Sequence, residues 1–354
     1  MKNFNKTKPR YLPLIDVFLK IYTPMTKLPI PIWLDCDPGN DDAFAILLSL
    51  FDSRFQLLGI STVHGNAPIS MTTHNTLGLL DLLRVYNKVK VYKGAEFPLK
   101  VPSKFALEVH GKNGLADIEF SENTINEISQ DMDCIEAMKQ TIDLNSENIN
   151  LVCTGTLTNV AKLITKYPDV TSQIKWVSIM GGSFGFGNIT PYAEFNFHTD
   201  PHAAKLVIQE LSNKVILSPL NFTHKVIATS EIRKHMYDDN NEKRSSPIRN
   251  VFFRILTFYY KVYAANGFLE GPPIHDPLAV YSLLPFFNSF EQYGYTCAQK
   301  NIDIITEGVR MGESVIVEGG NTDKGVYIGE AIDNKKFWDS ILLALQNADL
   351  QTKN

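Results

Sequence analysis

Cysteine is scarce in this chain, and no two cysteines have the spacing of a metal-binding or redox pair. The 354 residues contain four cysteines and no C-x-x-C motif. Scattered cysteines of this kind are typical of reduced thiols in a cytosolic-type compartment. The cysteine pattern therefore gives no signal for a zinc site.

The sequence also lacks an excess of basic charge and any long apolar run. The formal net charge is −4 at pH 7, whereas a general nucleic-acid footprint needs a strong basic excess. No apolar run approaches the roughly 20 residues of a membrane-spanning helix. With 44% hydrophobic and 20% charged residues, the composition predicts a soluble globular protein with neither a nucleic-acid nor a membrane partner.

The N-terminal 27 residues differ from the rest of the chain. They contain six basic residues and one acidic residue, Asp16, around the apolar stretch YLPLIDVFLKIY. Organellar targeting segments are basic and poor in acid, but they are usually rich in serine and arginine as well. We favour a disordered extension over residues 1–27, or a working start at Met25, in a cytoplasmic or nuclear protein. Organellar targeting is the less favoured alternative.

From residue 29 onward, apolar β-rich runs alternate with amphipathic helical patterns. Near-continuous apolar strands separated by helices indicate a parallel sheet covered on both faces. We therefore expect an α/β protein with an open, mostly parallel, Rossmann-like sheet flanked by helices. The predicted strands are 30–36, 55–65, 89–95, 148–155, 175–182 and 214–222, and the helical patterns between them are 41–51, 73–86, 134–144, 157–167 and 200–211.

The pattern changes after about residue 228. A polar loop is expected over residues 237–246, followed by an aromatic-rich helix that opens with Pro247, in the favoured first-turn position. Glycine-punctuated strands follow over residues 301–333, and a closing helix over residues 335–348. No linker interrupts the chain, so we expect one domain over residues 28–354.

Polar residues follow the ends of the apolar runs. In a parallel sheet, ligands bind beyond the carboxyl ends of the strands, which is where these residues fall. The segments are DCDPGNDD, HGNAP, TGTLTN, MGGSFGFGNITPYAEFNFHTD and LNFTHK, with HDP after a later Gly-Pro-Pro break. Their convergence on one edge of the sheet predicts a binding site there.

Four aspartates crowd the end of the first strand: Asp35, Asp37, Asp41 and Asp42. Their mutual repulsion is tolerable if a cation lies among them, and hard cations such as calcium take oxygen ligands. A tight turn at Pro38 would direct Asp37 and Asp42 at one point. Asp41 and Asp42 would also lie near a helix N-terminus, which favours negative charge.

Two other motifs compete for these aspartates. An EF-hand loop starting at Asp35 needs Gly at its sixth position and Glu at its twelfth, but Asn40 and Ile46 stand there. A haloacid-dehalogenase-type phosphatase also has D-x-D after a strand. It needs a later acidic pair with a matching upstream lysine, and none is clear here, so it remains the runner-up mechanism.

Amides, carboxylates and a histidine at the other strand ends form a set suited to reading sugar hydroxyls, because such groups can bridge neighbouring hydroxyls. Each one alone has an ordinary structural explanation as a turn residue, a cap or a buried histidine. The set is Asn66, Asn188, Glu194, Asn196, His275 and Asp276.

Together the motifs resemble one family. DCDPGNDDAFAILL is similar to the N-terminal signature of the nucleoside hydrolases, the inosine-uridine-type nucleoside N-ribohydrolases. HGNAP, HGKNGL, TGTLTNVA, IMGGSFGFGNITPYAEFNFHTDPHAA, PLNFTHK and IHDPLAV follow in the family's order, over residues 28–285. GPPIHDP and LNFTHK resemble most closely the fungal uridine ribohydrolases. The resemblance implies the nucleoside hydrolase fold and hydrolysis of ribonucleosides to ribose and base in nucleoside salvage.

The resemblance also implies a calcium site and roles for the site residues. The implied calcium ligands are Asp37, Asp42, Asp276 and the backbone carbonyl of Thr154, so that the Thr154 side chain need not matter. Asp37 would be the general base, Asn66 would position the water, and His275 would protonate or polarise the leaving base. The residues implied to bind the nucleoside are Asp41, Asn66, His110, Met180, Asn188, Glu194, Phe195, Asn196 and His275.

Several points stay open at this stage. Tyr259, Tyr260 and Tyr263 are candidate lid residues, and the sequence does not say which one faces inward. Uridine is the favoured substrate, with cytidine, purine ribosides or another riboside such as nicotinamide riboside as alternatives. A non-catalytic nucleoside-binding relative is a further alternative. Members of such a family are commonly homodimers or homotetramers, so we expect one of these assemblies.

Overall fold

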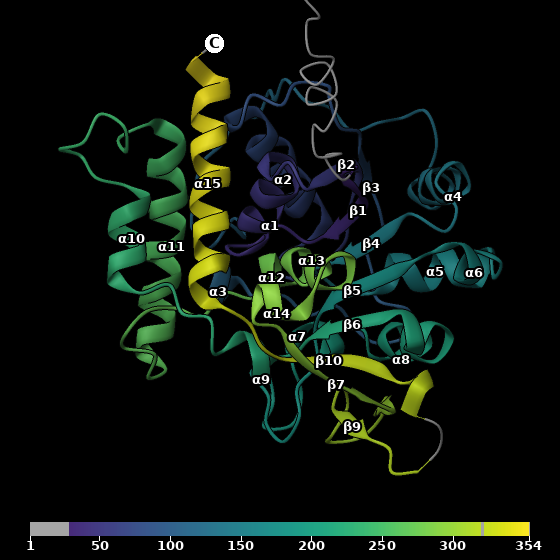
Figure 1. Cartoon of the computed structure of the whole chain (residues 1–354). Helices are drawn as coiled ribbons and strands as arrows, with labels where there is room; N and C mark the ends of the chain where they lie inside the picture. The colour runs from purple at the N-terminus through teal and green to yellow at the C-terminus, as the bar shows by residue number, and fades with distance from the viewer. Residues whose placement is uncertain (1–27, 320–321, 354) are drawn as a thin grey trace, which may run out of the picture.

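The computed structural model describes residues 28–319 and 322–353, and its centre is an eight-stranded sheet (Figure 1). The strand order is β3-β2-β1-β4-β5-β6-β10-β7. All neighbouring strands are parallel except β7, which pairs antiparallel with β10. The bounds are β1 Ile30–Cys36, β2 Phe55–Thr62, β3 Val91–Lys93, β4 Asn150–Cys153, β5 Trp176–Met180, β6 Val215–Ser218, β7 Thr296–Lys300 and β10 Val326–Ala331. The predicted mostly parallel sheet is confirmed.

The central strands are apolar on both faces, which explains why helices cover both. Along β1, Ile32 and Leu34 pack into one hydrophobic cluster, and Trp33 between them packs into the other. This alternation is expected because successive side chains of a strand point to opposite faces. A separate small sheet pairs β8 (Ile302–Ile304) with β9 (Ser314–Ile316).

Two helical layers enclose the sheet (Figure 1). One layer holds α1 Asp42–Phe51, α2 Ile69–Leu82, α11 Pro247–Ala265, α12 Asp276–Tyr281, α13 Leu283–Phe287 and α15 Asn334–Lys353. The other holds α4 Cys134–Leu144, α5 Thr158–Lys166, α6 Val170–Gln173 and α8 Pro201–Leu211. The remaining short helices are α3 Leu107–His110, α7 Phe195–Thr199, α9 Leu220–Thr223, α10 Ser230–Met236 and α14 Phe290–Tyr293, with 3₁₀ turns at Ser212–Lys214 and Thr322–Lys324.

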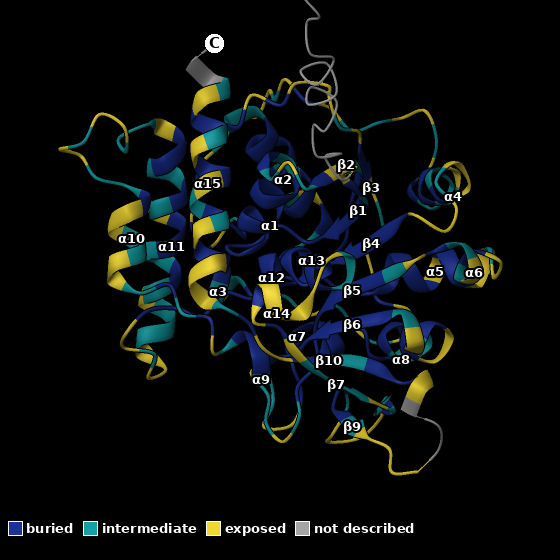
Figure 2. Ribbon diagram, viewed as in Figure 1, coloured by how far each residue is buried: buried dark blue, intermediate teal, exposed yellow. Residues whose placement is uncertain are grey.

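Burial follows this layering, with the strands and the inner helix faces dark in Figure 2. The predicted strand over 214–222 ends early, at Ser218, because Pro219 interrupts the sheet pairing and α9 begins at the next residue. The predicted helix over 73–86 starts earlier, at Ile69, after Pro68. It ends at Leu82, since Arg84 adopts a left-handed backbone with φ of 53°.

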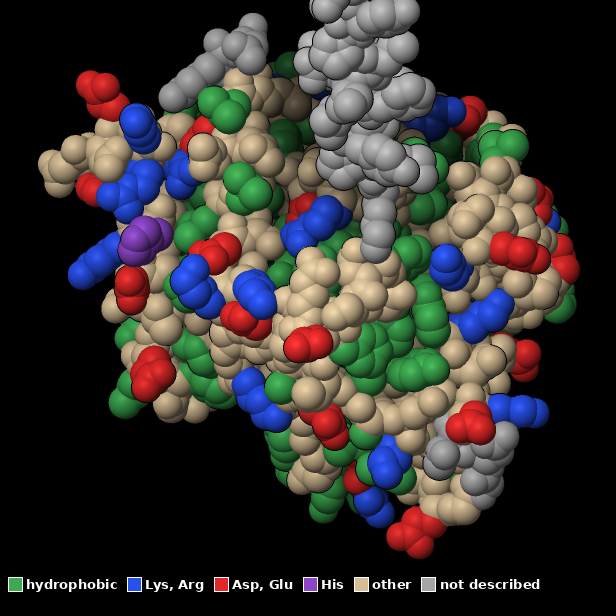
Figure 3. Space-filling view, viewed as in Figure 1, with side chains coloured by type: hydrophobic (Ala, Val, Ile, Leu, Met, Phe, Trp, Pro, Cys, Tyr) green, Lys and Arg blue, Asp and Glu red, His purple; other side chains and the backbone are tan. Residues whose placement is uncertain are grey.

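The predictions for the C-terminal half are confirmed. Pro247 opens α11, the strands β8, β9 and β10 follow, and α15 closes the chain. On the face shown in Figure 3, basic and acidic side chains are interspersed. Within the described residues, no helix is both long and apolar enough to span a membrane. The predictions made for residues 1–27 fall outside the described part of the chain.

Candidate active site

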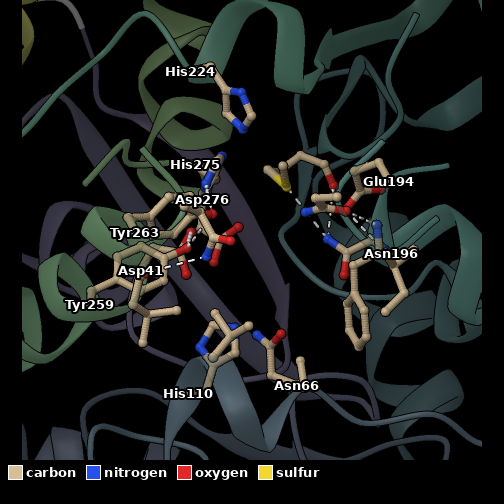
Figure 4. A pocket seen from close by; sticks show the side chains of 18 of the residues that line it. Asp41, Asn66, His110, Glu194, Asn196, His224, Tyr259, Tyr263, His275 and Asp276 are labelled. Atoms are coloured by element: carbon tan, nitrogen blue, oxygen red, sulfur yellow. Dashed lines mark hydrogen bonds between the residues drawn. The ribbon is translucent and has the colours of Figure 1, made fainter. Parts of the chain in front are cut away.

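A cavity of about 330 Å³ opens at the carboxyl edge of the sheet, where the polar segments were predicted to converge. Asn66 follows β2, Thr154 follows β4, and Met180 ends β5. Figure 4 shows side chains from these loops and from α11 facing one another across the cavity. The predicted residues that line it are Asp41, Asn66, His110, Thr154, Met180, Asn188, Glu194, Phe195, Asn196, His275 and Asp276.

Three buried carboxylates meet on one side of this cavity. Asp41, Asp42 and Asp276 place carboxylate oxygens within 4.8 Å of one another. Asp41 and Asp42 lie at the start of α1, and Asp276 is the first residue of α12. The packing of α1 against α12 therefore brings together the first and the last of the predicted polar segments, DCDPGNDD and HDP.

Asp37 lies close to these acids but is not one of the three. Its Oδ2 accepts a hydrogen bond from the Asn66 backbone N–H at 2.7 Å, and its Oδ1 is buried without a hydrogen-bond partner among the described residues. Two glycines leave room for the carboxylate: a Cβ at Gly65 would lie 2.0 Å from Oδ2, and one at Gly155 would lie 2.6 Å from Oδ1. The local sequence therefore keeps one oxygen of Asp37 available to a ligand.

Burial and mutual repulsion weaken the acidity of this group. Burial, followed by the charge of Asp42, raises the pKa of Asp37 well above its usual range. The same two causes raise the pKa of Asp41 to about 7. Burial and the charges of Asp41 and Asp42 raise the pKa of Asp276. Four acids with one orphaned oxygen fit a hard cation, because a cation would both supply the missing partner and offset the repulsion.

Thr154 contributes through both of its oxygens. Its hydroxyl donates to Asp42 Oδ1 at 2.7 Å, while its backbone carbonyl accepts from Asn196 Nδ2 at 2.8 Å. Action of Thr154 through its backbone carbonyl stays a prediction, and the structure adds that its hydroxyl orients one of the clustered carboxylates. Asn66 orients the other oxygen of Asp42 by donating from its Nδ2 at 3.1 Å.

The opposite wall is built around the start of α7. Glu194 caps this helix, and its carboxylate accepts hydrogen bonds from the backbone N–H groups of Gly182, Asn196 and Phe197. Burial nevertheless raises its pKa. Asn188 Oδ1 accepts from the Phe195 N–H at 2.9 Å. These bonds fix the polar wall before any ligand enters.

A hydrogen-bonded chain of aromatic residues closes the third side. His275 pairs through Nε2 with the Tyr263 hydroxyl at 2.8 Å and through Nδ1 with the Thr223 hydroxyl at 2.7 Å. Tyr259 lies one turn away on α11 and donates to Asp41 at 3.4 Å. Both tyrosines line the cavity, whereas Tyr260 donates to the Leu269 carbonyl outside it. The inward-facing tyrosines are therefore Tyr259 and Tyr263.

The histidines of the cavity are neutral at physiological pH. Burial lowers the pKa of His110 to about 3 and lowers that of His275 well below its usual range. His110 Nδ1 accepts from the Asn40 N–H at 3.0 Å, so the neutral ring carries its proton on Nε2. These rings can form hydrogen bonds but do not bring positive charge to the site.

Sequence reasoning missed three polar lining residues, Glu108, His224 and Asn266, and also the apolar residue Phe268 beside His224. His224 belongs to the LNFTHK segment after the sixth strand, so its position at a strand end was a usable signal. Phe268 carried no such signal, because the loop after α11 has no periodic pattern that says which way it faces.

Comparisons with known proteins identify the family to which this chain belongs. The family profile described as inosine-uridine preferring nucleoside hydrolase matches residues 32–339. The chain belongs to the nucleoside hydrolase family. It is therefore an enzyme that hydrolyses the N-glycosidic bond of ribonucleosides, and the predicted family is confirmed.

Individual nucleoside hydrolases match between 75% and 92% of this chain. The uridine nucleosidase of Saccharomyces cerevisiae is 39% identical over 92% of this chain and 98% of its own. A pyrimidine-specific ribonucleoside hydrolase of Escherichia coli is 35% identical over 75% of this chain and 83% of its own. The solved purine-preferring ribonucleoside hydrolase of Gardnerella vaginalis superposes with a TM-score of 0.80 at 25% identity, covering 90% of this chain and 99% of that one.

Proposed function

We propose that this nucleoside hydrolase is calcium-dependent and that its preferred substrate is uridine, which it cleaves to ribose and uracil. The observation that carries this proposal is the buried group of Asp37, Asp41, Asp42 and Asp276. Within the described part of the chain, Asp37 Oδ1 has no hydrogen-bond partner. The similarity to a uridine nucleosidase and to a pyrimidine-specific hydrolase supports the choice of base.

Calcium would be held by the carboxylates of Asp37, Asp42 and Asp276 and by the Thr154 carbonyl. All of these are oxygen donors, as a hard cation requires, and all are buried at one edge of the sheet. When bound, the ion lowers the pKa of a coordinated water and orients the sugar diol.

The protein's own residues hold the ribose and generate the nucleophile. Asp37 accepts the proton of the attacking water as general base. Asn66 positions that water, since its side chain reaches both the Asp37 carbonyl and Asp42. Positive charge develops on the ribose as the base departs, as in other glycosyl transfers. The ribose hydroxyls bind between Asp41 on one side and the wall formed by Asn188, Glu194 and Asn196 on the other.

His275 and Tyr263 assist the departing base. Because burial keeps His275 uncharged near neutral pH, we assign it polarisation by hydrogen bonding rather than protonation by an imidazolium. Its bond to Thr223 holds the ring in place, and its bond to Tyr263 extends the polar contact toward the base. Met180 lies at the end of β5 beneath the sugar site, and Phe195 and His110 complete the walls.

The test is ribose release from uridine, cytidine and inosine by the purified protein, before and after calcium removal with a chelator. We expect release to be fastest from uridine, to stop on chelation and to return with calcium. Asp37→Asn should lower kcat by roughly 10²–10⁴-fold, the range for a lost general base. Asp339→Asn, at an exposed ion pair on α15, is the matched control and should leave kcat unchanged.

Each part of the proposal has its own contrary outcome. Release that survives complete chelation would overturn the calcium requirement. A higher kcat/KM on inosine than on uridine would overturn the base preference. No release from any riboside with calcium restored would overturn uridine hydrolysis altogether.

A further inference from the structure

His224 extends into the cavity beyond His275, as Figure 4 shows. It is the last residue of the short segment that follows β6, and its backbone N–H donates to the Leu220 carbonyl. The ring is surrounded by other rings: its centroid lies 5.1 Å from that of Phe268, 5.6 Å from that of Phe186 and 5.6 Å from that of His275. His224, the centre of this aromatic wall, lies at the end of the cavity away from Asn66 (Figure 4).

One nitrogen of this ring has no protein partner. His224 Nε2 is buried and forms no hydrogen bond with any described residue. A buried polar atom without a partner destabilises the fold, so its presence in a native structure calls for an explanation such as a bound ligand or water. Burial also lowers the pKa of His224 to about 4, which leaves a neutral ring able to donate through one nitrogen and accept through the other.

The neighbours of His224 define what would meet it. The carboxylates and amides that suit a ribose lie on the sides of the cavity built by α1, α12 and α7. His275 lies between the carboxylates and His224 (Figure 4), and the Tyr263 ring is 5.3 Å from that of Phe268. A nucleoside whose ribose binds at the carboxylates therefore extends its flat, partly polar base past His275 to the aromatic wall.

We propose that His224 is a specificity-determining residue that hydrogen-bonds the polar edge of a pyrimidine base. This inference rests on the proposed function and names a contact that selects the base. The uracil edge presents two carbonyl oxygens with an N–H between them, and a neutral imidazole can pair with either kind of group. The rings of Phe186 and Phe268 flank His224 on either side of that contact.

The experiment compares uridine with 4-nitrophenyl β-riboside, whose leaving group departs without needing the polar edge of a base. We expect His224→Phe to lower kcat/KM for uridine by about 10- to 100-fold, the effect of one lost buried hydrogen bond. Most of the loss should be in KM. Hydrolysis of the nitrophenyl riboside should stay within about twofold, which also shows that the variant is folded. His224→Gln restores a donor and an acceptor and should recover part of the uridine activity.

His202→Phe provides a matched control. His202 also has a ring nitrogen without a hydrogen-bond partner among the described residues, but it does not line the cavity. Equal losses on both ribosides in His224→Phe, or an unchanged kcat/KM for uridine, would overturn the role of His224.

Failure of the proposed function is distinguishable from failure of this inference. If the wild-type protein released no ribose from any riboside, calorimetric binding of uracil to wild type and to His224→Phe would still decide the role. Equal affinities for uracil would overturn it, and a weaker affinity in the variant would support it.

Discussion

At the scale of single residues, the site depends on histidines that are held neutral. His64, one position before Gly65, is fully buried, and its Nε2 lies 3.1 Å from the Thr158 hydroxyl. Its Nδ1 has no hydrogen-bond partner in the part of the chain that the structure describes. Burial, with a smaller effect from the charge of Lys162, lowers its pKa to about 4. Protonation of this ring is therefore easier in the unfolded chain than in the folded protein.

This difference predicts a pH-dependent loss of stability. The His64 contribution is present above the unfolded pKa of 6.5 and is lost as the pH falls from 6.5 toward 4. Between pH 7.5 and 5 the wild type should lose about 2 kcal/mol more unfolding free energy than His64→Gln. Urea denaturation of both proteins at the two pH values measures the difference. Identical pH dependence in the two proteins would show that His64 does not titrate as its burial implies.

The aspartates were predictable as single residues, and some of their partners were not. Asp41 and Asp42 follow the apolar run of β1, so their position at the sheet edge follows from the general geometry of parallel sheets. Asp276 follows a Gly-Pro-Pro break instead, and the family resemblance implied its place beside them. The Thr154 hydroxyl bond to Asp42 depends on a rotamer that no spacing encodes. Tyr259 and Tyr263 share a helix face by their spacing of four, but which face points inward depends on how α11 packs.

At the scale of elements, α11 carries these two tyrosines and is anchored at its other end. Arg249, in the first turn of α11, forms a buried ion pair with Asp349 on α15. Arg249 also donates to the Met236 carbonyl at the end of α10, at 2.9 Å. Ser246, the residue that caps α11, donates to Asp349 at 2.5 Å. These bonds connect the C-terminal helix to the element that forms one wall of the cavity.

Breaking this pair should destabilise the whole fold. Arg249→Met leaves a buried carboxylate without its charged partner, and such changes cost about 3–5 kcal/mol. The double variant Arg249→Met/Asp349→Leu removes both charges and should recover much of the loss. Urea unfolding measures the free energies of unfolding. Lys335→Met, at the exposed Lys335–Asp339 pair on α15, is the control and should leave the free energy of unfolding nearly unchanged. A double variant no more stable than Arg249→Met would contradict the argument from an uncompensated charge.

At the scale of the whole molecule, the sheet class was predictable and its strand order was not. Alternating apolar runs and helical patterns specify parallel pairing with covered faces. The position of β10 between β6 and β7, and the antiparallel edge strand β7, depend on long-range pairing that no local pattern records. For the small sheet of β8 and β9, the sequence likewise predicted glycine-punctuated strands but not their pairing in a separate sheet.

The same architecture predicts that residues 1–24 are dispensable for catalysis. β1 begins at Ile30, whose N–H donates to the Arg54 carbonyl, and the described residues that line the cavity all lie within Asp41–Asp276. A chain started at Met25 keeps all of these contacts. Its kcat/KM for uridine should stay within about twofold of the full chain, as for changes outside a site.

The control for that truncation is a chain started at Asn40, which lacks β1. β1 pairs with both β2 and β4 at the centre of the sheet, so its removal should abolish folding as judged by the loss of a cooperative thermal transition. A more than tenfold loss of kcat/KM in the chain started at Met25, with its thermal transition intact, would show that residues 1–24 act at the site. A lost transition would instead show that the folded state needs them, so the two measurements together separate a catalytic contribution from a structural one.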